Sequence, residues 1–404
     1  GNYYDLDNYT DYVIGESFMT NVDWPYNNIK IYRSDATDFK WRFALQDLEL
    51  GLGPNSWTDC TTNHIEWLFG NTNGNPFTTP WYNMMQHDDY ELHFVNRFAD
   101  LLNTSYRSDR LLEIADYHFN MVIDEMPNYM ARWGDPNNVD GYVQWFIDNH
   151  NIFRDQLACR PEQVRYHIET YFGYQGQSQV TLLADPPQAG RIQINTIVPD
   201  SLPWSGIYFN GAPVTITAIA NPGYVFNYWS ADTLFQSHWH NDSLVINLFT
   251  DDQLTAHFIG APQPMKLMIS EVNYNDDASA ACGDWVELHN DGNGTVNLTG
   301  WSLTNDVNMP RFEFPAGTYV APNQYLVVAH DVAAFQSIYP NVTNVIGNFD
   351  FALPASGGTI RLLDHRDSIL REITYGDSLP WPMVADGGGR TLEWTVPSPP
   401  PLEN

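Results

Sequence analysis

The sequence predicts a multidomain α+β protein, and three observations support this prediction. The chain has 404 residues, which is long for a single hydrophobic core. Apolar residues recur at helical spacing up to about residue 173, but from residue 178 they alternate in short runs separated by Pro, Gly and Asn. A short linker, residues 260–264, then separates two β-rich parts. We therefore predict domains over residues 1–175, 176–260 and 265–397.

The first domain is predicted to open with a helix over residues 6–19 and an antiparallel hairpin. Residues 29–33 and 41–46 alternate apolar and polar side chains, as two paired strands do. One short loop can join these strands. Because the strands are antiparallel, the acidic turns before the first and after the second should meet at one end of the hairpin.

These two turns hold the candidate site residues. Asp23 and Asn28 have the D-x-x-x-x-N spacing of a kinase catalytic loop, while Asp47 and Glu49 follow the second strand. Magnesium that holds nucleotide phosphates prefers hard oxygen ligands, which Asn28, Asp47 and Glu49 could supply. Asp23 would then orient or deprotonate a hydroxyl nucleophile. The alternative is that these residues only form turns, as Asp and Asn often do.

The rest of the first domain is predicted to be helical. Apolar spacing indicates helices over residues 90–102, 109–132, 140–156 and 160–172. Ser108 is expected to cap the second of these, Pro127 to kink or split it, and Pro161 to lie in the first turn of the last. The aromatic residues of these helices are expected in the core. His64 and Glu66 form an H-x-E pair, but no further zinc motif accompanies them.

The second domain is predicted to be a small all-β module. Its short alternating runs are residues 179–183, 191–195, 214–219, 243–248 and 254–258. Tyr224, Phe226 and Trp229 are expected in its core, with a sugar-binding platform as the alternative. We expect His238 and His240 in an exposed loop rather than at a metal.

The third domain shows seven or more strand-like runs in about 130 residues, which favours an immunoglobulin-like β-sandwich. The runs are residues 267–272, 285–289, 296–298, 301–303, 325–329, 359–363 and 369–375. Glu271 and Glu287 are expected to be structural or surface carboxylates. A calcium site near Asp276, Asp277 and residues 291–294 is an alternative, although the EF-hand pattern is not met.

Composition limits the partners. With 18 basic and 49 acidic residues the net charge is −31, which disfavours nucleic acid and anionic membranes. No run of eighteen apolar residues predicts a membrane span. Three cysteines give neither a disulfide framework nor a zinc signature. A bridge between Cys60 and Cys159 remains one possibility that the sequence does not decide.

The first domain resembles the CotH family of spore-coat-type atypical protein kinases. The matching pieces are residues 6–12, 21–28, 40–42, 47–51, 94–103, 125–126, 132–133, 153–154 and 160–161. The resemblance implies that Asp23 is the catalytic aspartate, that Asn28 and Asp47 bind the metal of ATP with Mg²⁺ or Mn²⁺, and that Glu49 stands where such proteins often have a second aspartate.

One part of the kinase pattern is missing before Asp23. Kinases also use a glycine-rich loop and a lysine paired with a glutamate, all in an N-terminal lobe. Residues 1–22 contain neither. The expectation is a C-terminal lobe without its N-terminal partner, in a cut or processed chain that begins at Gly1 and binds nucleotide weakly.

The other two domains also show resemblances. Residues 189–194, 214–218, 221–226 and 255–258 resemble a divergent internalin-type B repeat, and residues 269–272, 284–290, 298–303 and 357–362 resemble the lamin-tail domain. This order implies a secreted or cell-surface bacterial kinase that phosphorylates an extracytoplasmic protein. The rival hypothesis is a non-catalytic adhesin or scaffold that binds a protein or glycan. Glycoside hydrolysis by Asp47 and Glu49 is disfavoured, because residues two apart on one turn do not oppose each other.

Overall fold

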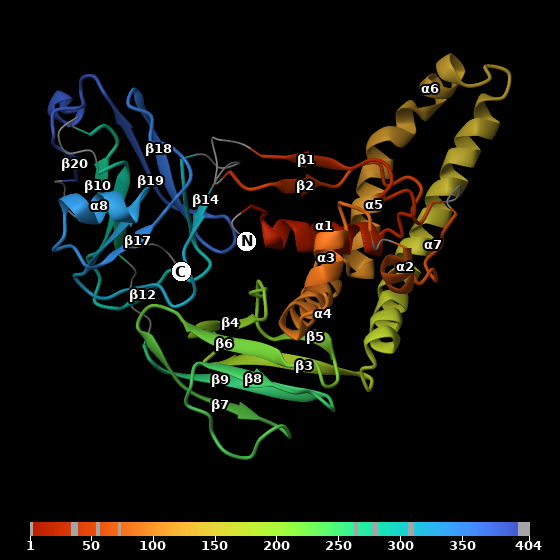
Figure 1. Cartoon of the computed structure of the whole chain (residues 1–404), viewed down its shortest axis with the longest axis horizontal. Helices are drawn as coiled ribbons and strands as arrows, with labels where there is room; N and C mark the ends of the chain where they lie inside the picture. Colours follow the sequence, from red (N-terminus) through yellow and green to blue (C-terminus); the bar gives the residue numbers. More distant parts are fainter. Residues whose placement is uncertain are drawn as a thin grey trace.

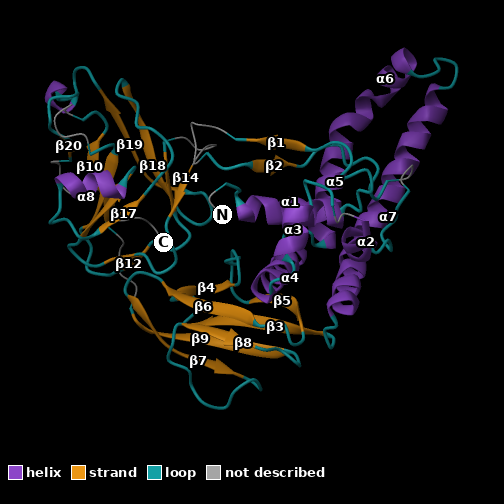
Figure 2. Ribbon diagram, viewed as in Figure 1, coloured by secondary structure: helices purple, strands orange, loops and turns teal. Residues whose placement is uncertain are grey.

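The computed structural model describes residues 3–33, 39–53, 57–71, 74–261, 266–276, 282–305 and 311–394. Its N-terminal part is helical and its C-terminal part consists of β-sheets (Figures 1 and 2). The helices of the first part are α1 Leu6–Phe18, α2 His64–Asn71, α3 Thr79–Met84, α4 Asp88–Leu102, α5 Ser108–Val122, α6 Met126–Trp133 and α7 Val139–Phe172, with the 3₁₀ turn η1 Ile123–Glu125. The strands β1 Lys30–Tyr32 and β2 Arg42–Ala44 pair antiparallel. The first helix and the hairpin are therefore confirmed, while most of the hairpin loop, residues 34–38, lies outside the described residues.

The predicted helix 109–132 is split, as expected near Pro127. The chain passes through η1, and α6 then begins at Met126 with proline in its first turn. Ser108 is not the cap but the first helical residue, and its hydroxyl donates to the Ala158 carbonyl oxygen at 3.0 Å. That contact joins two segments far apart in sequence, so local spacing could not predict it.

The aromatic side chains of α5 and α6 are not all in the core. Helices α5 and α6 lie alongside the N-terminal part of α7 and extend away from the other helices (Figure 1). Tyr117 and Trp133 are 62% and 68% exposed, and no residue of α5 is fully buried. The prediction of core positions was wrong here, because paired helices that extend alone bury only the surface between them.

The two helices predicted over residues 140–156 and 160–172 are one helix of 34 residues, α7, with Pro161 inside it. The continuation past the proline is held by tertiary contacts. The buried Arg160 guanidinium donates to four backbone carbonyls, those of Ser17, Phe18, Cys60 and Thr62, at 2.7–3.1 Å. A disulfide between Cys60 and Cys159 fixes the neighbouring turn. These contacts offset the backbone hydrogen bond that proline cannot make.

The β module contains two sheets. One has the order β5-β3-β9-β7 and the other β4-β6-β8. The strands are β3 Gln177–Asp185, β4 Gly190–Ile194, β5 Trp204–Phe209, β6 Val214–Ala220, β7 Tyr224–Ala231, β8 Ser243–Ile246 and β9 Asp252–Gly260. All five predicted strands are present. Tyr224 and Trp229 are buried, and half-buried Phe226 packs against the same core cluster, with its ring next to that of Trp229, which confirms their core positions.

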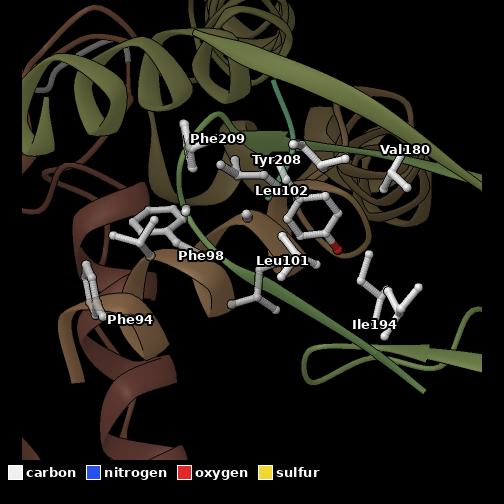
Figure 3. Packing of buried hydrophobic residues seen from close by; sticks show 14 of the residues in the cluster. Phe94, Phe98, Leu101, Leu102, Val180, Ile194, Tyr208 and Phe209 are labelled. Carbon is white, nitrogen blue, oxygen red and sulfur yellow. The ribbon is translucent and has the colours of Figure 1, made fainter. Parts of the chain in front are cut away.

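The helical part and the β module share one hydrophobic core. Figure 3 shows Phe94, Phe98, Leu101 and Leu102 of α4 beside residues of β3, β4 and β5. Inside this core the Asp100 carboxylate accepts hydrogen bonds from the Tyr208 hydroxyl at 2.8 Å and from the Thr196 backbone and hydroxyl. Burial raises the pKa of Asp100. The boundary predicted at residues 175 and 176 stays a prediction.

The C-terminal part is β-rich, with sheets β17-β16-β11-β10-β20, β14-β13-β18-β19 and β12-β15. Its elements are β10 Leu267–Asn273, β11 Trp285–Asn290, β12 Val296–Asn297, β13 Ser302–Thr304, β14 Arg311–Glu313, β15 Tyr319–Val320, β16 Tyr325–Ala329, α8 Val332–Ile338, β17 Val345–Gly347, β18 Gly357–Leu363, β19 Ile369–Gly376, the 3₁₀ turn η2 Met383–Ala385 and β20 Leu392–Glu393. The seven predicted strands are all present, and the larger of two buried apolar clusters in this part lies among these sheets.

Candidate functional site

Asp23 is held by the turn that follows it. The side-chain amides of Asn27 and Asn28 donate to the two Asp23 carboxylate oxygens at 2.7 and 2.9 Å, and the Asp23 backbone nitrogen donates to Asn21 Oδ1 at 3.2 Å. The spacing of five positions from Asp23 to Asn28 therefore allows a side-chain contact. Because the Asn28 nitrogen faces Asp23, its amide oxygen is left for another partner, which suits a metal ligand.

The hairpin brings the second acidic turn to the first. Lys30 pairs with Ala44 at the end of the β-ladder, and Gln46 donates from its side chain to the Asn28 carbonyl oxygen at 3.2 Å. Asp47 and Glu49 are exposed beyond this contact. A hydrogen bond with Asp47 is the main cause that raises the pKa of Glu49, and the charges of Asp47 and Asp23 add to it. The Gln46–Asn28 hydrogen bond thus joins the two acidic turns.

The backbone is left-handed at two of the candidate residues. Asn28 and Asp47 both have φ of +59°. Asn and Asp tolerate this region better than other non-glycine residues. Such conformations cluster at functional sites, where the surrounding structure holds them in place. Both residues are in the metal set predicted from the sequence.

The turn that contains Asp23 is connected to two buried polar side chains, Glu16 of α1 and His64 of α2. Glu16 of α1 is fully buried and accepts a hydrogen bond from the Asn21 side chain at 2.9 Å, while the ring of buried His64 contacts the Asn21 carbonyl oxygen at 3.2 Å. Burial raises the pKa of Glu16 to about 7 and lowers that of His64 to about 3. The Asn21 side-chain oxygen in turn accepts a hydrogen bond from the Asp23 backbone nitrogen, so Glu16 and His64 connect to the candidate catalytic residue through Asn21.

We expect Glu16→Gln to remove the part of the pH dependence of the unfolding free energy that the titration of Glu16 causes. Native Glu16 keeps its proton up to about pH 7, whereas the unfolded chain releases it near 4.5. The unfolded state therefore binds fewer protons in this window, and the Glu16 contribution should fall by about 3 kcal/mol as the pH rises from 4.5 to 7. Relative to the wild type, the Glu16→Gln variant should therefore become more stable as the pH rises through this range. Denaturant unfolding at pH 4.5 and 8 measures the difference.

The exposed residue Glu113 on α5 provides the control for this test. Glu113→Gln should show the same difference from wild type at both pH values. His64 acts in the opposite direction, since its lowered pKa costs stability as the pH falls below 6.5, but it is present in all three proteins and cancels. A Glu16→Gln difference that does not change with pH would contradict the assignment.

The structure places the other candidate metal or site residues in different environments. His64 is buried while Glu66 is exposed, and His238 and His240 lie in an exposed loop as predicted. Glu271 and Glu287 are half-buried; the Glu287 carboxylate accepts from the Ser270 hydroxyl at 2.7 Å, and the Thr391 hydroxyl donates to Glu271. Asp277 lies outside the described residues. Within the described part of the chain, no three His, Cys, Asp or Glu side chains are arranged to hold a metal ion.

Sequence reasoning missed Glu16, Asn21 and Gln46. Glu16 gives one signal, because it is the single acidic residue among the apolar positions Val13, Ile14 and Phe18 of α1. Asn21 and Gln46 give no comparable signal. Their contacts depend on the path of the chain between α1, α2 and the hairpin, which local spacing does not define.

Comparison with protein families finds matches in three segments of the chain. Residues 1–160 match the family described as CotH kinase protein, residues 200–260 the divergent InlB B-repeat domain and residues 261–377 the lamin tail domain. A search among curated proteins found no match.

One solved structure is similar in part. It is a DUF4876 family protein from Bacteroides thetaiotaomicron, 12% identical, and the alignment covers 46% of this chain and 66% of that one, just under two thirds of its length. Its TM-score of 0.17 is too low to support an argument about the fold. The family matches confirm the resemblances and their order: the chain joins a CotH-family segment, a divergent InlB B-repeat and a lamin tail domain in one polypeptide.

Proposed function

We propose that the protein is an atypical protein kinase that transfers the γ-phosphate of ATP to a hydroxyl of an extracytoplasmic protein. The observation that carries this proposal is the contact of Asn28 with Asp23, at the end of the hairpin where Asp47 and Glu49 follow. The match of residues 1–160 to the CotH kinase family supports it.

Each residue has a distinct role in the proposed reaction. The Asp23 carboxylate accepts the proton of the attacking hydroxyl, and Asn27 and Asn28 fix the orientation of that carboxylate. The Asn28 and Asp47 oxygens would hold Mg²⁺ or Mn²⁺, with Glu49 as a further carboxylate. When bound, the metal would neutralise charge on the nucleotide phosphates. Glu16 and Asn21 position the turn and touch no reacting group.

Calorimetric titration of ATP with Mn²⁺ or Mg²⁺ tests the binding part of the proposal. It uses this chain and the natural protein with any residues that precede Gly1, here called the extended form. We expect metal-dependent binding in the extended form, and a loss of affinity of at least about tenfold in Asp47→Ala, because one of few protein carboxylates on the metal is removed.

Asp124→Ala is the matched control for this titration. Asp124 is an exposed carboxylate in η1, outside the two acidic turns, so its removal changes the net charge equally without touching the site. Affinity should stay at the wild-type value. If Asp47→Ala and the control bind ATP equally well, the metal assignment is wrong.

We also propose that the protein acts outside the cytoplasm, secreted or at the cell surface. The Cys60–Cys159 disulfide is consistent with an oxidising compartment. Across the described residues, every helix is too short or too polar to cross a membrane. We further propose that the lamin tail domain is an immunoglobulin-like sandwich, with its five- and four-stranded sheets on opposite sides of one core.

The rival function is a non-catalytic adhesin or scaffold that binds a protein or glycan through the β modules. The observation that favours it is the share of the chain given to these modules, since the B-repeat and lamin tail matches together span residues 200–377. Absence of metal-dependent ATP binding in a folded, extended protein would favour this alternative.

A further inference from the structure

Three polar side chains of the β module form a hydrogen-bonded chain that has no part in the proposed kinase reaction. The Ser230 hydroxyl lies 2.8 Å from His257 Nε2, and His257 Nδ1 lies 3.0 Å from Asp185 Oδ2. A serine on one imidazole nitrogen and a carboxylate on the other is the arrangement of a nucleophile, its general base and the group that orients the base. Such sets are identified by geometry and not by their order along the chain.

The sheet β5-β3-β9-β7 brings these side chains together from three neighbouring strands (Figure 1). Asp185 at the end of β3 is the register partner of His257 on β9. Ser230 on β7 pairs with Thr255, two positions before His257, and side chains at this diagonal spacing are within reach of each other. Trp229, directly before Ser230, and both neighbours of His257 are buried. Because side chains alternate along a strand, the three polar groups lie on the face of the sheet that is turned away from the core.

The hydrogen bonds define where the protons of this chain lie. An ionised carboxylate only accepts hydrogen bonds, so His257 Nδ1 carries the proton that it donates to Asp185. In the neutral imidazole Nε2 is then an acceptor, and the Ser230 hydroxyl donates to it. This is the tautomer that a general base requires, since Nε2 is free to take the serine proton.

A ring contact also holds the His257 imidazole. Its centroid lies 4.4 Å from that of the Tyr228 ring in a stacked arrangement, and the His238 ring stacks on Tyr228 at 3.9 Å. Stacking of this kind favours one orientation of the rings. The His257 side chain is nevertheless 21% exposed, so a reactant can approach it. The base is thus oriented by two hydrogen bonds and one stacked ring before any substrate arrives.

We propose that Ser230, His257 and Asp185 form a second active site, which hydrolyses carboxylic esters. Ser230 Oγ attacks the carbonyl carbon of the ester, and its proton passes to His257 Nε2. The bond from that carbon to the alcohol oxygen breaks, and the alcohol leaves with the proton from His257. Water then attacks the acyl carbon and gives a proton to His257, which returns it to Ser230 Oγ as the carboxylic acid is released. Asp185 touches no reacting atom and is a positioning residue.

The position of the site favours an ester that projects from a larger molecule. Sites for small molecules are usually concave, whereas these three groups lie on the outer face of a sheet. The Asp185 side chain is 64% exposed, and Ser230 and His257 are half-buried. An ester group on the surface of a larger molecule can reach Ser230 here without entering the protein interior. Small activated esters can reach it by the same route and therefore serve as probes.

The test treats the whole chain with two probes, a fluorophosphonate and p-nitrophenyl acetate. The first forms a bond from its phosphorus to a nucleophilic serine oxygen, with loss of fluoride, and the second releases p-nitrophenol on acyl transfer. We expect one label per chain, located on Ser230 by peptide mass spectrometry. Ser230→Ala should abolish this label and lower ester hydrolysis at least about tenfold, and His257→Gln should slow both reactions at least about tenfold.

Ser205→Ala is the matched control. Ser205 lies on β5 of the same sheet, and its hydroxyl contacts Thr181 Oγ1 at 2.8 Å in place of an imidazole nitrogen. Labelling and hydrolysis should keep their wild-type rates, and circular dichroism confirms that each variant is folded. Absence of label on Ser230, or a rate of labelling that folded His257→Gln leaves unchanged, would overturn the proposal and show that the three side chains only stabilise the sheet.

Asp185→Asn tests the positioning role. Its side-chain amide can donate to Nδ1 and so favours the tautomer in which Nε2 carries the proton. We expect kcat for p-nitrophenyl acetate to fall at least about tenfold with little change in KM, because the base is removed and the ester still reaches Ser230. An unchanged kcat would contradict the role of Asp185.

Discussion

Replacement of Arg160 by alanine is expected to destabilise the helical part by about 3 kcal/mol or more. The Arg160 guanidinium is fully buried and donates to the carbonyls of Ser17 and Phe18 at the end of α1 and to those of Cys60 and Thr62 before α2. Burial lowers the pKa of Arg160 to about 9, so it is still mostly charged at neutral pH. The variant would leave these four carbonyls, three of them in buried contacts, without this donor. Denaturant unfolding measures the change, and hydrogen exchange of the α1 C-terminus locates it.

Two further variants make this prediction specific. Arg160→Lys keeps a positive charge but has three donors on one nitrogen, so it should recover only part of the stability. Arg110→Ala removes an exposed arginine from α5 and should change stability by less than about 0.5 kcal/mol. A loss below about 1 kcal/mol in Arg160→Ala would show that the four contacts do not hold α7 to α1.

Loss of the Cys60–Cys159 disulfide is expected to cost about 4 kcal/mol. The bridge links residues 99 positions apart, and a crosslink that closes so long a loop strongly restricts the unfolded chain. It also holds the loop before α2 against the middle of α7. We expect the Cys60→Ser, Cys159→Ser double variant to unfold at a clearly lower denaturant concentration than the oxidised protein.

Chemical reduction of the disulfide in the wild-type protein provides the matched control. Dithiothreitol should lower the stability of the wild type to near that of the double variant and should not change the double variant. The third cysteine, Cys282, is a buried free thiol in the lamin tail domain and is common to both proteins. If mass spectrometry shows a reduced bridge but the unfolding midpoint is unchanged, the disulfide does not stabilise this fold.

Elements with a regular local pattern could be predicted from the sequence. The helix of residues 6–19, the hairpin and the strands with regular alternation depend on periodicity within a few residues, which the chain shows directly. Strand β5, Trp204–Phe209, was missed because Ser205 and Gly206 interrupt its alternation. The short strands β14, β15, β17 and β20 offer too few residues for a pattern.

Features that depend on long-range contacts could not be predicted. The continuity of α7 through Pro161 depends on Arg160 and Cys159, whose partners lie near residues 17 and 60. The shared core of the helical part and the β module includes the hydrogen bond from the Tyr208 hydroxyl to the Asp100 carboxylate, which joins residues 108 positions apart. Spacing along the chain contains no information about either contact.

Part of the candidate site could be predicted from local sequence features, and part of it could not. The spacing of Asp23 and Asn28 and the antiparallel hairpin were sufficient to predict that the two acidic turns meet, because both are local features. The buried support from Glu16 was not predicted, since it depends on the packing of α1 beneath the turn. The catalytic and metal roles of Asp23, Asn28, Asp47 and Glu49 stay predictions until they are measured.

The most direct test of the kinase proposal is transfer of radiolabelled γ-phosphate from ATP to protein acceptors, with Mn²⁺ or Mg²⁺. It compares the N-terminally extended protein with its Asp23→Asn variant. We expect metal-dependent labelling by the wild type and a loss of about 10²-fold or more in the variant, with ATP binding retained, because only the proton acceptor is removed. Labelling by Asp23→Asn at the wild-type rate, or no labelling by a wild type that binds ATP, would contradict it.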